Sequence, residues 1–424
     1  MTKDIIAELQ ARNLIAQTTD LAALQEALNA GMVTLYCGFD PTAPSLHLGN
    51  LAQIVTMRRF QLAGHRPLAL VGGATGLIGD PKQSGERNLN DAEVVEQWVG
   101  LIRQQLEKYF DFSGSNACQV VNNYDWTKGI SAIEFLRDIG KHFPVNRMLD
   151  REAVSARLST VGISYTEFSY VLLQSLDFLE LYRNFDCTLQ IGGSDQWGNI
   201  TAGCDLIRRV DSGSAHALTT PLITKADGTK FGKTESGTVW LDPEKTTPYA
   251  FYQFWLNADD RDVATLLNTY SFKTVEEIAA LLEEAQAAPH LRLGQRALAD
   301  ELTTLVHGAD AAIAAQLAGK ALFGQADLAE LDEATLTQAL AEAGLVDVAR
   351  IEGQLPSVAD LFVAAGVTPS KGAARRAVEE GGAYVNNVKV ADADAALEES
   401  ALLHGRLVVL RRGKKTIAGA RLAG

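Results

Sequence analysis

The sequence predicts an α/β fold for the first half of the chain, followed by a helical segment and a small α+β unit. Short apolar, β-prone runs alternate with helical patterns up to about residue 220, as in an α/β domain. Alanine and leucine then dominate to about residue 345, and a stretch without periodicity precedes the last unit. The expected domains are an α/β domain at 1–220, a loop region at 221–245, a helical domain at 246–345, a linker at 346–356 and an α+β domain at 357–424.

The individual elements follow from local patterns. Four short apolar runs predict strands at 34–39, 67–72, 118–122 and 187–191. In the helical segment, Pro248 suits a first helical turn, and Thr274 with Glu277 forms a capping box. A chain of 424 residues with 47% hydrophobic content is long enough to form two or three domains with their own cores.

The segment TLYCGFDPTAPSLHLGN, residues 34–50, is the most informative part of the first domain. It runs from an apolar strand through a Pro-rich turn into an amphipathic helix that ends at Gly64. Unpaired amides and the dipole at a helix start favour an anion there. His47 lies in the turn and Thr42 offers a hydroxyl, so the pattern indicates a phosphate site; the alternative for His47 alone is a solvated turn histidine.

A second motif, KADGTKFGKTESG at 225–237, intersperses lysines with glycines. Lys225, Lys230 and Lys233 on such a loop can close over a polyphosphate, with Thr234 as a further donor. The alternative is an exposed basic hairpin, because glycine and lysine are common loop residues.

Two further strand ends carry glycines followed by polar groups. GGATGLIGDP, at 72–81, places Asp80 where it can pair with a substrate ammonium, or can form a turn before Pro81. IGGSDQWGN, at 191–199, presents Asp195 and Gln196, and a carboxylate in that position commonly holds ribose hydroxyls.

The segment YVLLQSLD places polar residues on one face of an otherwise apolar helix. Tyr170, Gln174 and Asp177 are spaced i, i+4 and i+7. Because the other positions are apolar, the helix should be buried and its polar groups require partners. We therefore expect a ligand at this face.

Composition narrows the class of protein. No apolar run approaches the roughly 20 residues that span a bilayer. The amphipathic start of the chain is unlike a secretion signal, so we expect no membrane association and a cytoplasmic location. The four cysteines have neither disulfide-like nor metal-ligand spacing, so no protein metal site is expected. Net charge is −14, yet ten basic residues exceed seven acidic ones from residue 357 onward.

Together these motifs resemble the bacterial tyrosyl-tRNA synthetases of class I, and the resemblance covers essentially the whole chain. The family's HIGH signature appears as His47–Asn50, with Asn50 in place of the last histidine, and its KMSKS signature appears as KFGKT at 230–234. The KFGKT form, together with GGATGLIGDP and GGSDQWGN, is specific to the tyrosine enzyme. The implied fold is a Rossmann-like class I synthetase catalytic domain, an α-helical anticodon-side domain and a small RNA-binding domain.

The resemblance implies that tyrosine and ATP give tyrosyl-adenylate and pyrophosphate, and that the tyrosyl group then passes to the terminal ribose of tRNA(Tyr). Catalysis would depend on positioning and on stabilising charge on the leaving pyrophosphate. Mg²⁺ is expected with ATP as substrate, without a dedicated protein site. The implied catalytic residues are Thr42, His47, Asn50, Lys230, Lys233 and Thr234.

Further site residues are implied position by position. Tyr36 and Asp177 would bind the substrate phenol, so that a buried site built for a hydroxyl rejects phenylalanine. The ammonium and carboxyl of tyrosine would be held by Asp80, Tyr170, Gln174 and Gln196. The implied ATP contacts are Cys37, Gly38, Asp40, His47, Gly49, Gly192, Asp195 and Lys233.

The tail SKGAARRAVEEGGAYVNNVKV, at 370–390, resembles the RNA-binding module of ribosomal protein S-four. It places Lys371, Arg375 and Arg376 along one helix, where they would contact RNA phosphates. The alternative is an ordinary surface helix. The family also implies a homodimer.

Three other functions compete with this interpretation. One is a non-catalytic RNA-binding relative, which the intact loop lysines oppose. Another is an ATP-dependent nucleotidyltransferase without a tRNA partner, which the basic tail opposes. The third is the tryptophan-specific sister enzyme, which has no need of Tyr36 and Asp177 for a phenol.

Overall fold

The computed structural model describes residues 4–81, 89–150, 152–158, 162–229, 231–234, 237–350, 353–413 and 415–423. The chain divides into two compact units, one of residues 1–242 with 259–289 and the other of residues 243–258 with 290–424. Among the described residues, no helix is long and apolar enough to cross a membrane.

The first unit is built on a six-stranded sheet of order β1-β6-β5-β2-β3-β4. All neighbouring strands are parallel except β1 with β6. The strands are β1 (Gln17–Thr18), β2 (Thr34–Phe39), β3 (Arg66–Val71), β4 (Gln119–Asn122), β5 (Cys187–Gly193) and β6 (His216–Thr220). The four strands expected from apolar runs are thus confirmed, and the predicted α/β class is correct.

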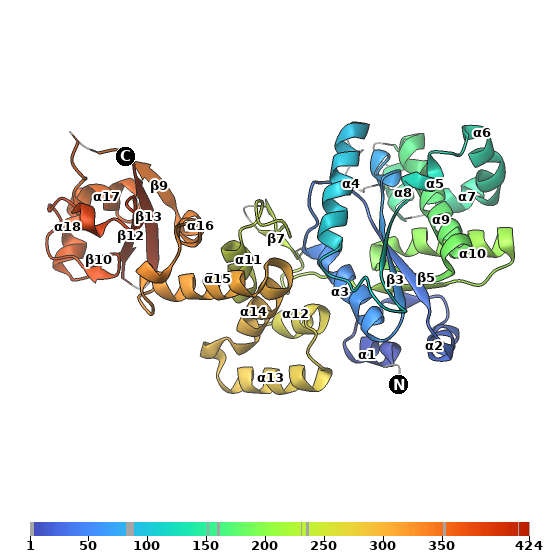
Figure 1. Ribbon diagram of the computed structural model, residues 1–424, viewed down its shortest axis with the longest axis horizontal. Coiled ribbons are helices and arrows are strands. Elements are labelled where there is room, and N and C mark those ends of the chain that lie inside the picture. Colours follow the sequence, from blue (N-terminus) through green and yellow to red (C-terminus); the bar gives the residue numbers. More distant parts are fainter. Residues whose placement is uncertain are drawn as a thin grey trace. The chain divides into compact units, whose positions relative to one another are not determined.

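Helices cover both faces of this sheet; in Figure 1, α3 and α4 lie on one side of it and α9 and α10 on the other. The longer helices of the first unit are α1 (Ile5–Ala11), α2 (Leu21–Ala30), α3 (Leu48–Leu62), α4 (Ala92–Leu106), α8 (Glu152–Leu158), α9 (Tyr165–Phe185), α10 (Trp197–Asp211), α12 (Val263–Tyr270) and α13 (Val275–Ala287). The shorter ones are α5 (Tyr124–Thr127), α6 (Ala132–Glu134) and α7 (Val145–Leu149). A small hairpin pairs β7 (Lys233–Thr234) with β8 (Gly237–Thr238).

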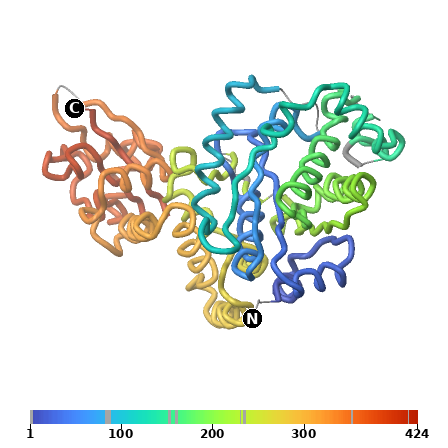
Figure 2. Tube along the Cα trace, turned by 45° about the vertical axis from the view of Figure 1, so that its right-hand side comes forward, coloured from blue at the N-terminus to red at the C-terminus, as the bar shows by residue number. Residues whose placement is uncertain are grey.

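The order of strands fixes where a ligand can bind. The chain runs outward from β2 to β3 and β4, then returns to place β5 and β6 on the other side of β2. Figure 2 shows the trace of the chain coloured along its sequence. In an open parallel sheet, ligands bind outside the carboxyl ends of the strands at the point where the order reverses. Here that point lies between β2 and β5.

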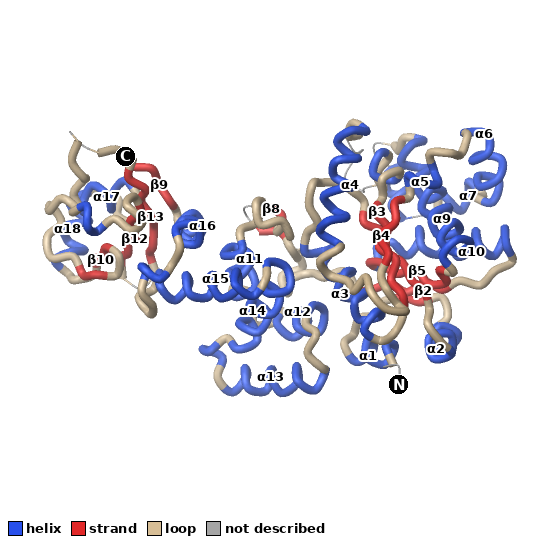
Figure 3. Tube along the Cα trace, viewed as in Figure 1, coloured by secondary structure: helices blue, strands red, loops and turns tan. Residues whose placement is uncertain are grey.

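The second unit combines packed helices with a five-stranded sheet of order β11-β10-β12-β13-β9. Strands are drawn in red in Figure 3. Its helices are α11 (Pro248–Leu256), α14 (Leu293–His307), α15 (Ala309–Leu322), α16 (Glu333–Ala343), α17 (Val358–Ala364) and α18 (Lys371–Glu379). Its strands are β9 (Leu345–Val348), β10 (Ala383–Val385), β11 (Val388–Lys389), β12 (Leu407–Arg412) and β13 (Thr416–Leu422). The apolar sides of α17, α18 and the sheet form one core.

The compact units do not follow the expected domain boundaries. Residues 259–289, expected in the helical domain, belong to the first unit. Residues 345–348, expected at the end of the helical domain and the start of the linker, form β9 and pair in parallel with β13. Both differences arise from contacts between segments distant in sequence, which a local pattern does not report.

Candidate active site

The turn between β2 and α3 is closed by side chains that cap the helix. His47 is the N-cap, and its Nδ1 accepts a hydrogen bond from the amide of Gly49 at 3.1 Å. Asn50 Oδ1 accepts one from the backbone N–H of His47, also at 3.1 Å. Asparagine at the fourth position of the HIGH signature therefore serves as the second half of a capping box. Thr42 and Gly49 are exposed beside this turn.

The loop that carries KFGKT lies against the same turn. The amide of Leu48 donates to the carbonyl of Val239 at 3.3 Å, and the amide of Val239 donates to Gly232 at 3.0 Å. Gly232 has φ +82, and a Cβ there would lie 3.3 Å from Leu48 Cβ. Glycine is needed at this position because of both the backbone conformation and the space. Lys230 lies outside the described residues, and Lys233 and Thr234 form β7.

At the opposite end of the site, Tyr36 and Asp177 are both buried inside the sheet–helix layer. Tyr36, on β2, is 1% exposed, and its hydroxyl has no hydrogen-bond partner among the described residues. Asp177, on α9, accepts hydrogen bonds from Asn123 Nδ2 at 3.0 Å and from Trp126 Nε1 at 2.9 Å. The two donors fix the carboxylate while one buried hydroxyl nearby remains unsatisfied.

Burial raises the pKa of Asp177 to about 7, although the hydrogen bonds from Asn123 and Trp126 lower it. Burial, with the charge of Asp177, also raises the pKa of Tyr36 well above its usual value. A desolvated carboxyl that titrates near neutral pH beside an unpaired hydroxyl is characteristic of a ligand site.

A series of hydrogen bonds between side chains joins α9 to the residue that follows β2. Tyr170 donates from its hydroxyl to Asp40 Oδ2 at 2.7 Å, and Thr75 Oγ1 donates to Asp40 Oδ1 at 2.6 Å. Asn123 Nδ2 donates to Thr75 Oγ1 at 3.0 Å, which links this series to Asp177. A Cβ at Gly72 would lie 2.0 Å from Asp40 Oδ1, so only glycine allows the carboxylate to lie here.

Asp80, which is predicted to bind an ammonium, lies beside polar side chains of the segment that follows β5. Asp80 accepts from Gln196 Nε2 at 3.1 Å and from Asn199 Nδ2 at 3.2 Å. Gln174 Oε1 and Gln190 Oε1 are buried acceptors without a partner in the described part of the chain. Gln190 is the β5 residue paired with Tyr36, so it belongs to the same site. Unsatisfied buried acceptors require a donor, as a ligand ammonium would provide.

The remaining predicted ATP contacts lie around the ends of β2 and β5. Cys37 is buried, its Sγ lies 3.8 Å from the carbonyl of Gly38, and burial raises its pKa to about 12, so it is a neutral thiol. Gly192 is buried, and a Cβ there would lie 3.0 Å from Ile200 Cδ1. Asp195 is exposed on the 3₁₀ turn η4 (Ser194–Gln196).

Sequence reasoning missed several members of this network. Asn123 directly follows the strand expected at 118–122 and Trp126 lies in the short helix α5 just after it, so their position near a strand end was the available signal. Thr75 lies within the glycine segment already singled out, and Gln190 lies one residue before Ile191. No group of three or more metal-ligating side chains is gathered among the described residues.

Comparison with known proteins gives the family. Residues 28–324 match the family model "tRNA synthetases class I (W and Y)", and residues 334–418 match the "Tyrosine--tRNA ligase SYY-like C-terminal domain". The chain is 63% identical over 423 residues to a tyrosine–tRNA ligase of Streptomyces avermitilis, with 99% of each chain covered. The chain belongs to the tyrosine–tRNA ligase family.

Solved structures agree with this family. A C-terminally truncated mitochondrial tyrosyl-tRNA synthetase of Aspergillus nidulans is 29% identical with a TM-score of 0.69, covering 76% of this chain and 94% of that one. The corresponding Coccidioides posadasii protein is 29% identical with a TM-score of 0.66, covering 74% of this chain and 91% of that one. The resemblance to the tyrosyl-tRNA synthetases stated from the sequence is confirmed. The class I catalytic fold that it implied is also confirmed.

Proposed function

We propose that this member of the tyrosine–tRNA ligase family activates L-tyrosine with ATP and transfers it to the 3′-terminal ribose of tRNA(Tyr). The observation that carries the proposal is the buried pair of Tyr36, with an unsatisfied hydroxyl, and Asp177, with a fixed carboxylate. A substrate phenol placed between them donates to Asp177 and satisfies Tyr36. Phenylalanine would leave the Tyr36 hydroxyl unpaired and would give Asp177 no donor beyond Asn123 and Trp126. An unpaired buried polar group costs about 1–3 kcal/mol.

The opposite end of tyrosine would be held by polar groups from three segments. The ammonium would bind Asp80, Tyr170 and Gln174, and Gln196 would approach the carboxyl. We add Gln190 to this set because its unsatisfied oxygen lies on the strand next to Tyr36.

The first reaction joins a tyrosine carboxylate oxygen to the α-phosphorus of ATP while the bond to pyrophosphate breaks. No side-chain nucleophile is required, so the protein positions the reactants and stabilises charge on the leaving group. The turn of His47 and Asn50 and the loop of Lys233 adjoin through Leu48, Val239 and Gly232. The residues assigned to this step are Thr42, His47, Asn50, Lys230, Lys233 and Thr234.

ATP itself would lie across the carboxyl ends of β2 and β5. Its contacts would be Cys37, Gly38, Asp40, His47, Gly49, Gly192, Asp195 and Lys233. Asp40 is already held by Tyr170 and Thr75, so its role would be to orient these groups as well as to face the nucleotide. Mg²⁺ would enter with the phosphates of ATP rather than in a protein cage.

The tRNA would be bound by the later segments, with 1–220 as the catalytic domain, 246–345 on the anticodon side except for 259–289, and 357–424 as the RNA-binding domain. Residues 259–289 belong to the first unit. On α18, Lys371 pairs with Asp360 at 2.5 Å and Arg375 pairs with Asp394 at 2.8 Å. The Lys371 and Arg375 side chains are exposed, and ion pairs at the surface are weak, so phosphates can replace the carboxylates. Arg376 is exposed on the same helix and completes the proposed contact.

A homodimer in the cytoplasm is part of the proposal. Several large apolar side chains are exposed in one stretch of the first unit, which favours a protein partner. Among the described residues they are Ile133, Leu136, Val145, Leu149 and Tyr165. A second copy of this chain would bury them.

Tyrosine-dependent exchange of labelled pyrophosphate into ATP tests the activity. We expect exchange with tyrosine and essentially none with phenylalanine or tryptophan. Lys233→Ala should lower kcat about 100- to 1,000-fold, the scale of losing one charge-stabilising group. Equilibrium dialysis with labelled tyrosine should show an unchanged Kd.

Each alternative gives a different result in the same assay. Exchange with tryptophan alone would indicate the tryptophan-specific sister enzyme. Absence of exchange with any amino acid, from protein with normal thermal unfolding, would indicate a non-catalytic RNA-binding relative. Lys128→Ala, at an exposed lysine of the first unit outside this loop, serves as the control.

A further inference from the structure

Helix α12 lies outside all the recognised motifs, yet it contacts both signature segments. Tyr270, its last residue, is completely buried and donates from its hydroxyl to the carbonyl of Leu48 at 3.0 Å. The ring of Phe231, in KFGKT, lies 6.1 Å from the ring of Tyr270. One side chain of α12 therefore contacts the HIGH turn and the KFGKT loop together.

The other end of α12 holds the base of the loop. Asp262 is the N-cap residue, but its side chain does not cap its own helix. Its Oδ1 accepts instead from the amide of Ala226 at 2.8 Å. A pocket of about 360 Å³, lined by Lys225, Thr265 and other residues, adjoins the base of the loop. The hydrogen bond from Ala226 to Asp262 joins the loop base to α12 beside this pocket.

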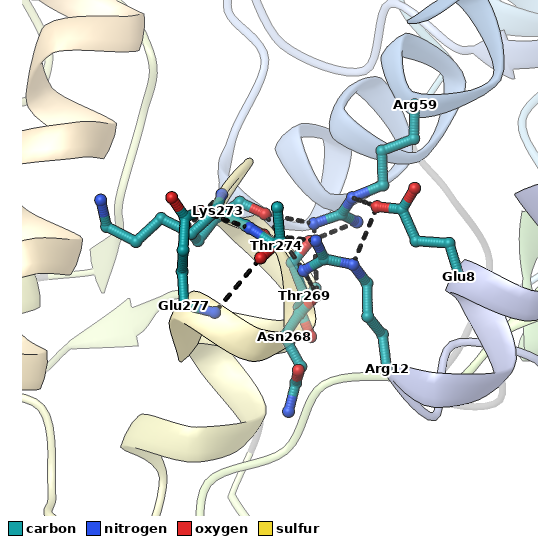
Figure 4. Close-up of polar contacts among 9 residues, drawn as sticks. Glu8, Arg12, Arg59, Asn268, Thr269, Lys273, Thr274 and Glu277 are labelled. Carbon is teal, nitrogen blue, oxygen red and sulfur yellow. Dashed lines mark hydrogen bonds and ion pairs between the residues drawn. The ribbon is translucent and has the colours of Figure 1, made fainter. Parts of the chain in front are cut away.

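The carboxyl end of α12 is fixed by two buried arginines from other helices, shown in Figure 4. Arg59, on α3, donates to the carbonyls of Thr269 at 2.9 Å and Ser271 at 2.7 Å. Arg12, which follows α1, donates to the carbonyls of Asn268 and Ser271, both at 3.3 Å. Both side chains are about 3% exposed.

This arrangement satisfies the groups that a helix end leaves unpaired. The last carbonyls of a helix have no intrahelical donor, and the negative end of its dipole attracts cations. Glu8 Oε1 lies 3.0 Å from Arg12 Nε and 4.0 Å from Arg59 Nε, so one carboxylate partly balances two buried charges. Buried guanidinium groups and carbonyls are costly without hydrogen-bond partners. The contacts between them therefore fix the position of the carboxyl end of α12.

We propose that α12 is a positioning element for the activation step, with Asp262 and Tyr270 holding the KFGKT loop against the HIGH turn and Arg12 and Arg59 fixing the helix that carries them. The inference rests on the proposed function, because it assumes that this loop acts on ATP. These residues are not among the assigned substrate contacts. Asp262 acts through the loop, and Tyr270 acts by joining the loop to the HIGH turn. A small displacement of the loop lowers kcat because the charge-stabilising groups must lie close to the leaving pyrophosphate.

Tyr270→Phe is the decisive variant, since it removes one hydroxyl and keeps the ring against Phe231. We expect kcat for pyrophosphate exchange to fall about 3- to 10-fold, the scale of one buried hydrogen bond, with the Kd for tyrosine unchanged. Asp262→Ala should behave similarly, and Asp262→Asn should restore activity because its amide oxygen can still accept from Ala226. Tyr252→Phe is the matched control, because it removes a buried hydroxyl that donates to Asp300 in the second unit.

A double-mutant cycle with Lys233→Ala separates positioning from general stability. If Tyr270 acts through the loop, Tyr270→Phe should have almost no further effect on single-turnover adenylate formation once Lys233 is removed. Equal effects in both backgrounds, or parental kcat in Tyr270→Phe, would overturn the inference. Failure of the parent protein to exchange with tyrosine would instead contradict the proposed function.

Discussion

The two ends of the candidate site are built differently. At the proposed phenol end, Asp177 receives hydrogen bonds from two other side chains and is buried with Tyr36 between a strand and a helix. At the proposed phosphate end, Leu48, Val239 and Gly232 are joined through backbone groups, and Thr42 and Gly49 are exposed.

The difference follows from what each end has to do. Discrimination between tyrosine and phenylalanine requires polar groups that cannot be solvated when the hydroxyl is missing, and this requires burial. Binding ATP and releasing pyrophosphate requires an open end where amides, a helix start and cations meet a large anion. Substitutions at the phenol end should therefore change selectivity, and those at the phosphate end should change rate.

The largest effect that would test this contrast is expected from Tyr36→Phe. It removes the unsatisfied hydroxyl, so kcat/KM for tyrosine should fall about 10- to 100-fold while that for phenylalanine changes little. Pyrophosphate exchange with both amino acids measures the ratio. Tyr109→Phe, at another buried tyrosine outside the site, provides the control. An unchanged tyrosine-to-phenylalanine ratio would show that this end does not set selectivity.

The next effect concerns pH. The pKa of Asp177 is raised by burial from an ordinary 3.8 to about 7. Between these values the folded protein binds more protons at this carboxyl than the unfolded chain, so its contribution to the free energy of unfolding falls as pH rises through this window. Relative to Asp177→Asn, which cannot titrate, the parent should lose about 2 kcal/mol between pH 5 and pH 7.

Urea unfolding of the parent and Asp177→Asn at several pH values measures this difference. Asp125→Asn supplies the control, because the Asp125 side chain is 69% exposed. A parent-to-variant difference that stays constant from pH 5 to pH 7 would mean that the carboxyl is not desolvated as the structure indicates.

The contrast between the two ends also explains what the sequence could predict. The four strands, the capping residues and the glycine segments depend on neighbouring residues, so local patterns reveal them. The partners of Asp177 could not be found in this way: Asn123 and Trp126 lie 54 and 51 positions earlier in the chain. The hydroxyl of Tyr270 reaches Leu48 across 222 positions.

Contacts between residues distant in sequence also explain why 259–289 belong to the first unit. The helical pattern of 259–289 resembles that of the residues that follow, so the sequence predicts one continuous helical domain. What assigns α12 to the first unit is its contact with Arg12 and Arg59, and those two arginines resemble ordinary surface residues in the sequence. A buried arginine is recognised only when the carbonyls around it are known.

The smallest expected effect comes from substitutions of Asn50. They separate its contribution to capping α3 from a contribution to binding ATP. Asn50→Ala removes the acceptor for the His47 amide, which should cost about 0.5–1 kcal/mol of stability and lower kcat a few-fold. Asn50→Asp keeps the acceptor and adds a charge that a helix start favours. Its stability should equal or exceed the parent's, while repulsion of the phosphates should raise KM for ATP. Parental KM for ATP in Asn50→Asp, measured by exchange beside thermal unfolding, would show that Asn50 serves the helix cap alone.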